Sequence, residues 1–212
     1  MGWLIWIGGA SVVLCLVLLT VPMTIRAKRS PEIWEAMGNA RQIGLALFDF
    51  ETKYGKFPDA STVAEVRRDT GSKLSLPDRT SNDLFAQLLA GNAFIGSERI
   101  FYAKAKNAKR ADDIYNSDAT ILEHGECAFA YVAGLTAAGN PSRPIAFGPV
   151  IPGTSTLDQK SCLGKAILLR IDNSVTAHPI NSSGKIFIDG MDFLDPRQPY
   201  WDGKAPDVKW PK

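Results

Sequence analysis

The chain has 212 residues, of which 45% are hydrophobic and 22% charged, and its formal net charge at pH 7 is +2. This length suits one domain with a sizeable core. Because the 24 basic and 22 acidic residues nearly balance and are spread along the sequence, we expect no nucleic-acid partner, which would need clustered basic charge.

An apolar segment comes first. Residues 3–25 contain no Asp, Glu, Lys or Arg, and as a helix they would be about 34 Å long, enough to cross a hydrocarbon core of about 30 Å. A cleaved signal peptide would have a basic start, a shorter apolar stretch and a small-residue cleavage site. We therefore predict an uncleaved, single-span membrane anchor over residues 1–29, with Trp3 and Trp6 at one interface and Arg26 and Lys28 at the other.

Residues 30–60 are predicted to form an amphipathic stalk helix and a turn. Ser30, Pro31 and Glu32 suit the N-cap, the first position and the first turn of a helix. Apolar residues then recur at helical spacing at Ala36, Ala40, Ile43, Leu47, Phe50 and Tyr54. We expect Ile43, Leu47, Phe50 and Tyr54 to form a packing face, and Gly55 and Pro58 to end the helix. An ordinary core helix would show the same pattern.

Residues 61–212 have the pattern of an α+β domain that includes the stalk helix. Residues 81–83 cap a predicted short helix that ends at Gly91. Residues 98–103 and 127–133 have strand character. Residues 166–180 form the best hairpin signal, two apolar runs around Asp172 and Asn173, and residues 186–188 suit an edge or third strand. The predicted fold is an N-terminal transmembrane helix continuing into an amphipathic helix that packs on a small antiparallel sheet.

Two segments resemble a known family. The segment NARQIGLAL (residues 39–47), followed by YGKFP (residues 54–58), resembles the end of the long N-terminal helix of type IV pilin-like proteins and type II secretion pseudopilins. The segment GKAILLRIDNSV (residues 164–175) is similar to a hairpin of the same proteins. The resemblance implies a pilin-like fold and a non-enzymatic, membrane-anchored component of a bacterial envelope secretion or pilus system, with other pilin-like or secretion-system proteins as partners.

The sequence departs from this family at its start. The prepilin hallmark is a short basic leader ending in Gly, followed by Phe-Thr-Leu-Ile-Glu, and the first 31 residues contain neither that pattern nor any Glu. This departure favours an alternative function, a stand-alone membrane-anchored envelope domain that is derived from the pilin fold and binds a ligand or an envelope partner.

Two indications disagree about the side of the membrane on which the soluble part lies. The positive-inside rule places Arg26, Lys28 and Arg29 in the cytoplasm, whereas the resemblance places the same residues outside it. We expect the inner membrane as the location of the anchor and the periplasm as that of the soluble part, as in the resembled family.

Cysteine usage leaves two states open. Cys15 lies in the predicted span, so Cys127 and Cys162 are the one candidate disulfide of the soluble part. A bridge would suit an oxidising periplasm, and two buried free thiols fit the sequence equally well.

Motifs for chemistry are few. His124 and His178 stand apart from any zinc or nucleophile motif, so we expect neither catalysis nor a cofactor. The resemblance implies a calcium ion in a C-terminal loop, where Asp189, Asp192, Asp195 and Asp202 are the candidate ligands. Because the EF-hand spacing is missing, a solvated loop with Asp turn residues is the favoured interpretation.

Overall fold

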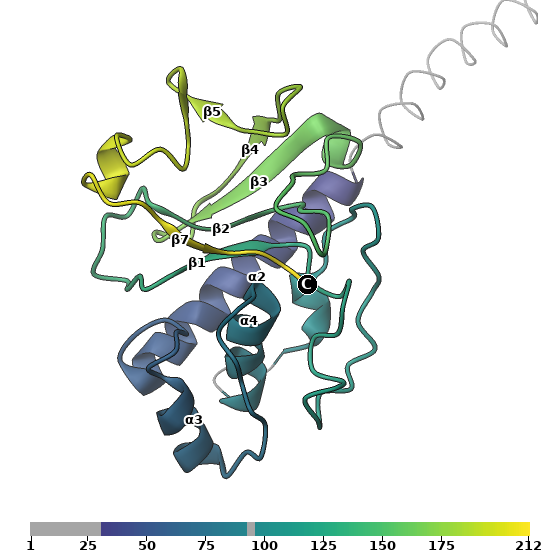
Figure 1. Ribbon diagram of the computed structural model, residues 1–212, viewed down its shortest axis with the longest axis vertical. Helices are drawn as coiled ribbons and strands as arrows, with labels where there is room; N and C mark the ends of the chain where they lie inside the picture. The colour runs from purple at the N-terminus through teal and green to yellow at the C-terminus, as the bar shows by residue number, and fades with distance from the viewer. Residues whose placement is uncertain (1–30, 93–95) are drawn as a thin grey trace, which may run out of the picture.

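The computed structural model describes residues 31–92 and 96–212. Its centre is a five-stranded antiparallel sheet (Figure 1) with the strand order β4-β3-β2-β1-β7. The strands are β1 (Ala130–Ala133), β2 (Pro144–Gly148), β3 (Lys165–Arg170), β4 (Val175–Pro179) and β7 (Asp207–Lys209). The predicted α+β class and the antiparallel sheet are therefore confirmed.

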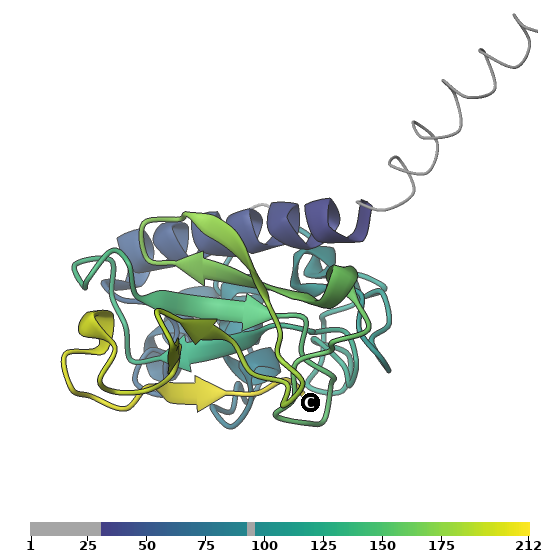
Figure 2. The same ribbon diagram turned by 90° about the horizontal axis from the view of Figure 1, so that it is seen from above.

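Helix α2 (Pro31–Tyr54) packs along one face of this sheet (Figure 2). The stripe predicted from the sequence faces inward, because Ala36, Ala40, Ile43, Leu47, Phe50 and Tyr54 are all buried. The helix ends where a glycine follows it, since Gly55 has a φ of 79°, a conformation that glycine adopts without strain.

The other face of the sheet is covered by the C-terminal segment. Ile186, Phe193 and Trp201 pack there against β1, β2 and β3 in a second hydrophobic cluster. This segment contains a small separate sheet of β5 (Phe187–Ile188) and β6 (Met191–Asp192), and the 3-10 helix η3 (Pro199–Trp201). Because both faces are covered, residues 166–169 of β3 are all buried, and the strand has a continuous apolar run in place of alternation.

Shorter helices lie around α2: α3 (Val63–Thr70) and α4 (Ser81–Ala90) near its C-terminal end, the 3-10 helix η1 (Glu98–Phe101) along its flank and the 3-10 helix η2 (Cys162–Gly164) at its start. The cap of α4 lies one residue earlier than predicted. Thr80 is the N-cap, and its side chain accepts a hydrogen bond from the backbone N–H of Asp83, whose carboxylate in turn accepts one from Thr80 N–H at 2.9 Å. The predicted end at Gly91 is confirmed.

Some predicted strands differ from the structure. Residues 98–103 were expected to form a strand, but residues 98–101 form the 3-10 helix η1, because the Ser97 side chain caps its start and the Glu98 side chain is buried. Residues 187–188 form a strand, but it pairs with β6 and not with the main sheet. The hairpin predicted over residues 166–180 is confirmed as β3 and β4.

The membrane anchor predicted over residues 3–25 lies outside the described residues. Within residues 31–92 and 96–212, no helix is long and apolar enough to cross a membrane.

Candidate functional site

The packing face of α2 is committed to the domain core. The side chains of Ile43, Leu47 and Phe50 are at most 1% exposed. Tyr54 is buried as well, and its hydroxyl group lies 3.0 Å from the Asp69 carboxylate and 3.1 Å from the Gly91 carbonyl. Burial raises the pKa of this phenol, so it remains a neutral donor. The four residues predicted as a packing face therefore have no surface to offer to another protein.

The flanks of α2 are held by polar contacts with the surrounding loops. Glu35 forms an ion pair with Arg110 at 2.6 Å, and the Asn39 amide donates to the carbonyl of Tyr102 at 2.8 Å. Near the other end, Glu51 accepts hydrogen bonds from the backbone N–H of Ala137 at 2.9 and 3.0 Å. These contacts fix the rotation of the helix about its axis.

One side of α2 stays open to solvent. Trp34 and Leu45 are the large apolar side chains on it, with exposed fractions of 63% and 56%. They are eleven residues apart, which is about three helical turns or 16 Å along the axis. We call this surface the outer face and define it by its exposed residues, Trp34, Arg41, Gln42, Leu45 and Asp49.

The four aspartates of the predicted calcium loop do not converge. Asp192 pairs with Lys185 at 2.9 Å, Asp195 with Arg197 at 2.7 Å, and Asp202 with Arg143 at 2.7 Å. The Arg197 guanidinium lowers the pKa of Asp195 to about 2. Among the residues described, no group of three or more His, Cys, Asp or Glu side chains could hold a metal ion. The predicted loop, Asp189 included, is therefore not gathered into a calcium site.

The candidate disulfide is not formed. Cys127 and Cys162 are both free and buried, and they contact different elements. The Cys127 thiol lies 3.7 Å from the Ser81 hydroxyl in α4, whereas the Cys162 thiol lies 3.8 Å from the carbonyl oxygen of Glu32 in α2. Burial raises the pKa of Cys127 to about 12 and that of Cys162 to about 11. Thiols of this kind are poor nucleophiles.

The histidines form no hydrogen bond with these thiols within the residues that the structure describes. The ring of His178, on β4, lies 2.9 Å from the Thr176 hydroxyl. Burial and the charge of Arg170 lower the pKa of His178, which favours the neutral ring. Within the described part of the chain, no hydrogen bond joins a histidine to a cysteine, aspartate or glutamate side chain. Among the described contacts, none pairs Cys127 or Cys162 with a base that would activate its thiol.

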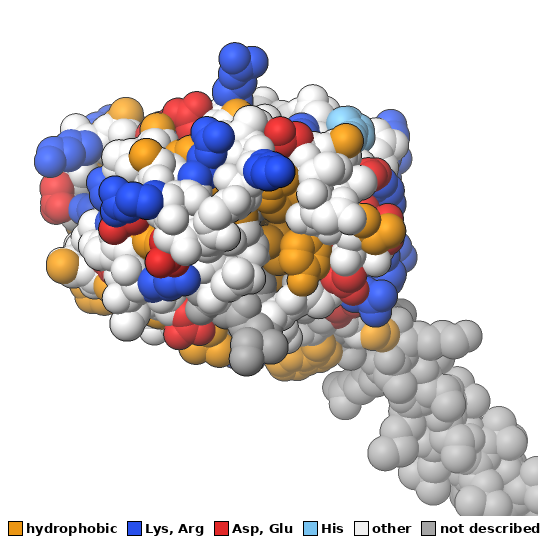
Figure 3. Space-filling model, turned by 90° about the horizontal axis from the view of Figure 1, so that it is seen from below, with side chains coloured by type: hydrophobic (Ala, Val, Ile, Leu, Met, Phe, Trp, Pro, Cys, Tyr) orange, Lys and Arg blue, Asp and Glu red, His pale blue; other side chains and the backbone are white. Residues whose placement is uncertain are grey.

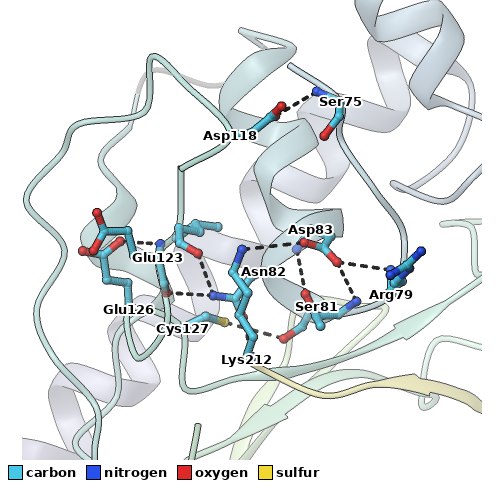
Figure 4. A network of polar contacts seen from close by, with 12 residues as sticks. Ser75, Arg79, Ser81, Asn82, Asp83, Asp118, Glu123, Glu126, Cys127 and Lys212 are labelled. Carbon is cyan, nitrogen blue, oxygen red and sulfur yellow. Dashed lines mark hydrogen bonds and ion pairs between the residues drawn. The ribbon is translucent and has the colours of Figure 1, made fainter. Parts of the chain in front are cut away.

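A buried polar network joins α4 to the C-terminal segment (Figure 4). The Asn82 amide donates to the carbonyl of Leu122 at 2.9 Å, and its oxygen accepts from the backbone N–H of Lys212 at 2.9 Å. Ser81 donates to the carbonyl of Phe129 at 2.7 Å. The sequence indicates only a helix cap at residues 81–83, because the partners of this network are 40 or more residues away along the chain. The network positions β7 at the edge of the sheet.

Glu98 is a further buried polar residue that the sequence does not indicate. Its side chain is fully buried, and its Oε1 atom accepts a hydrogen bond from the backbone N–H of Leu122 at 2.8 Å. Its Oε2 atom has no hydrogen-bond partner among the described residues. Burial, together with the charges of Glu126, Asp112 and Asp113, raises the pKa of Glu98 to about 7. Because Glu98 begins a segment predicted as a strand, its sequence context does not indicate that its side chain is buried.

Two features of the surface bear on partners. An open cavity of about 600 Å³ lies between residues 104–106 and 156–161, with Lys104, Lys106 and Lys160 in its wall. On the face shown in Figure 3, basic and acidic side chains are interspersed, and apolar side chains lie in a hollow near the centre. That face carries mixed charge, with no separate basic groove of the kind that nucleic acid needs.

Comparison with known protein families, with curated proteins and with solved structures finds no significant match in any of the three.

Proposed function

We propose that this chain is a non-enzymatic, membrane-anchored, pseudopilin-like component of a bacterial envelope secretion or pilus system. In this proposal, residues 3–25 span the inner membrane and the described domain lies in the periplasm. The observation that carries the proposal is the two-sidedness of α2. The helix supports an antiparallel sheet with one side and leaves the opposite side, the outer face, open over its length.

This arrangement supports assembly through helices. Trp34 and Leu45 lie on one line of the outer face, with small or polar residues between them. Such a stripe can receive the ridge of a second helix, as in ordinary helix packing. The buried side of α2 cannot bind a second helix, because exposing it would unfold the core.

The chemistry of the described domain supports a role without catalysis. The two thiols have raised pKa values, and the calcium-loop aspartates are taken up by Lys and Arg side chains.

A second candidate function is a stand-alone anchored envelope domain that binds a ligand or an envelope partner. The observation that favours it is the lack of any Glu among residues 1–31, because pilin-like subunits carry a Glu in the apolar helix that is thought to set their register in the filament.

Deletion and complementation in the source bacterium test the proposal. We expect deletion to reduce protein secretion or piliation, and the wild-type gene to restore it. A Leu45→Asp variant should fold, because its side chain is exposed, and should fail to restore the function. The matched control is Phe187→Asp, another exposed apolar position with an exposed fraction of 47%, which should restore it. Unchanged secretion and piliation after deletion would favour the stand-alone domain.

A further inference from the structure

A group of basic and apolar side chains surrounds the start of α2. Cys162 of η2 contacts the carbonyl oxygen of Glu32 in the first turn of the helix, and the Glu32 side chain pairs with Lys104. From the exposed residues of the segments on either side of these contacts, we define the basal patch as Lys106, Lys160, Leu163 and Lys165.

The basal patch has surplus positive charge. Two neighbouring acids are neutralised by ion pairs, since Glu32 pairs with Lys104 and Glu35 with Arg110. Asp158 keeps its negative charge, which offsets only one of the three lysines. The Asp158 carboxylate accepts hydrogen bonds from the backbone N–H groups of residues 106 and 160 and from the Ser161 hydroxyl, at 2.7 to 2.9 Å. The three lysines of the patch form no ion pair with any carboxylate in the described ranges, so their charges are available to an external anion.

Leu163 is exposed to solvent and lies between Lys160 and Lys165 in the sequence. Its side chain is 61% exposed, and its backbone has a φ of 57° in the left-handed region, between Cys162 at 49° and Gly164 at 69°. A leucine rarely adopts this conformation. Exposed apolar side chains surrounded by lysines are typical of surfaces that bind anionic membranes, where the charge meets the headgroups and the apolar group enters the interface.

The chain that precedes α2 indicates which surface the basal patch meets. The proposed span ends at residue 25 and α2 begins at Pro31, so six Cα–Cα steps separate them. Even fully extended, they reach about 20 Å. Side chains of a helix also tilt toward its N-terminus, which directs the exposed Trp34 toward the N-terminal end of α2. The start of α2 therefore stays close to the bilayer surface.

We propose that the basal patch docks on the anionic phospholipid headgroups of the membrane that holds the anchor. Lys106 and Lys160, in the wall of the 600 Å³ cavity, bind the headgroup phosphates, and Leu163 enters the interfacial region. This contact sets the tilt of the domain relative to the membrane and so the direction in which the outer face points. The inference rests on the anchor of the proposed function and not on the secretion role.

Hydrogen exchange of the full chain in lipid nanodiscs tests this. Discs of phosphatidylglycerol and discs of phosphatidylcholine are compared by mass spectrometry. We expect amides of residues 103–107 and 159–166 to exchange at least threefold more slowly in the anionic discs. Lys106→Glu with Lys160→Glu should abolish the difference. Lys73→Glu with Lys204→Glu, an equal charge change at exposed lysines elsewhere, should leave it intact.

A second variant separates docking from folding. Leu163→Asn suits the left-handed backbone, because Asn tolerates positive φ, and should keep the fold while reducing the protection in anionic discs. A chain that enters the discs but exchanges equally in both lipids would overturn the docking and leave the anchor standing. A chain that stays outside the discs would overturn the anchor, and the docking with it.

Discussion

Gly44 of α2 and Asn173 of the β3–β4 turn lie in direct contact. A Cβ atom at position 44 would overlap the Asn173 side-chain oxygen and lie 3.1 Å from the Cδ1 atom of Leu169. Asn173 itself has a φ of 61°, and its Oδ1 atom is buried without a hydrogen-bond partner among the described residues. The hairpin can approach the helix this closely only because residue 44 lacks a side chain.

We expect Gly44→Ala to destabilise the domain by up to about 2 kcal/mol. Alanine favours a helix by about 1 kcal/mol relative to glycine, but the overlap with the hairpin costs more, as overpacking of a core costs about 1–3 kcal/mol. Urea unfolding of residues 30–212 measures the change. The matched control is Gly38→Ala in the same helix, where no atom lies within 4 Å of the added Cβ, and it should stabilise by about 0.5–1 kcal/mol.

A double variant isolates the contact. Asn173→Gly removes the overlapping side chain at a position whose backbone suits glycine, so Gly44→Ala combined with it should recover most of the lost stability. If Gly44→Ala stabilises as much as Gly38→Ala does, the close approach is not a packing constraint.

The packing face of α2 yields a second prediction. Leu47 is 1% exposed, so Leu47→Asp places a carboxylate in the core without a partner. The expected cost is several kcal/mol, which is comparable to a typical total stability of about 5–15 kcal/mol. Arg41→Ala on the outer face should change stability by less than about 0.5 kcal/mol. Circular dichroism melts compare the two, and near wild-type stability of Leu47→Asp would mean that the helix does not carry the core.

The helix and the hairpin could be predicted because their signals are local. Positions 36 to 54 repeat at helical spacing, and residues 166–180 place two apolar runs around a turn, so neighbouring residues contain the whole pattern. The covering of the second sheet face could not be predicted. It depends on Phe193 and Trp201 meeting strands far away in sequence. Strands β2 (residues 144–148) and β7 (residues 207–209) were not predicted either, because their partners in the sheet are also distant in sequence.

The polar interior was harder still to predict. Glu98 resembles a surface residue in the sequence, yet it is buried, and its Oε1 atom accepts a hydrogen bond from the backbone N–H of Leu122. The separate burial of Cys127 and Cys162 likewise depends on which elements they contact. In the loop of residues 189–202, Asp192 and Asp195 pair with Lys185 and Arg197, which are close in sequence, whereas Asp202 pairs with the distant Arg143.

Glu98 predicts a pH dependence of stability. Its pKa is raised from 4.5 to about 7 in the folded chain, so the folded state binds more protons than the unfolded state between these values. Stability should therefore fall as the pH rises from about 5 to 7, by up to about 3 kcal/mol. Glu98→Gln should remove this slope and stabilise the domain at pH 8 but not at pH 5.

Urea unfolding at the two pH values measures the effect. Glu65→Gln serves as the control, because its carboxylate is partly exposed in α3 and lies 3.5 Å from Arg68; it should leave the slope unchanged. A slope that survives in Glu98→Gln would assign the pH dependence to other groups.

The proposed topology is tested by fusions to the C-terminus of the full chain. If residues 3–25 span the membrane and the domain is exported, a fusion to alkaline phosphatase should be active and a fusion to a fluorescent protein that folds only in the cytoplasm should be dark. The opposite pair of results would show that Arg26, Lys28 and Arg29 stay in the cytoplasm, as the positive-inside rule predicts.

The central claim is that the outer face of α2 packs against another helix of an assembly. The most direct measurement places a photo-reactive phenylalanine analogue at Leu45 of the full chain in the source bacterium, with the same group at Phe187 as the control. We predict a cross-link from position 45 to the outer face of α2 in a second copy, or to the corresponding helix outside the membrane in another pilin-like protein, mapped by mass spectrometry, and none from position 187. A domain that folds and reaches the membrane but forms no helix cross-link from position 45 would contradict the claim.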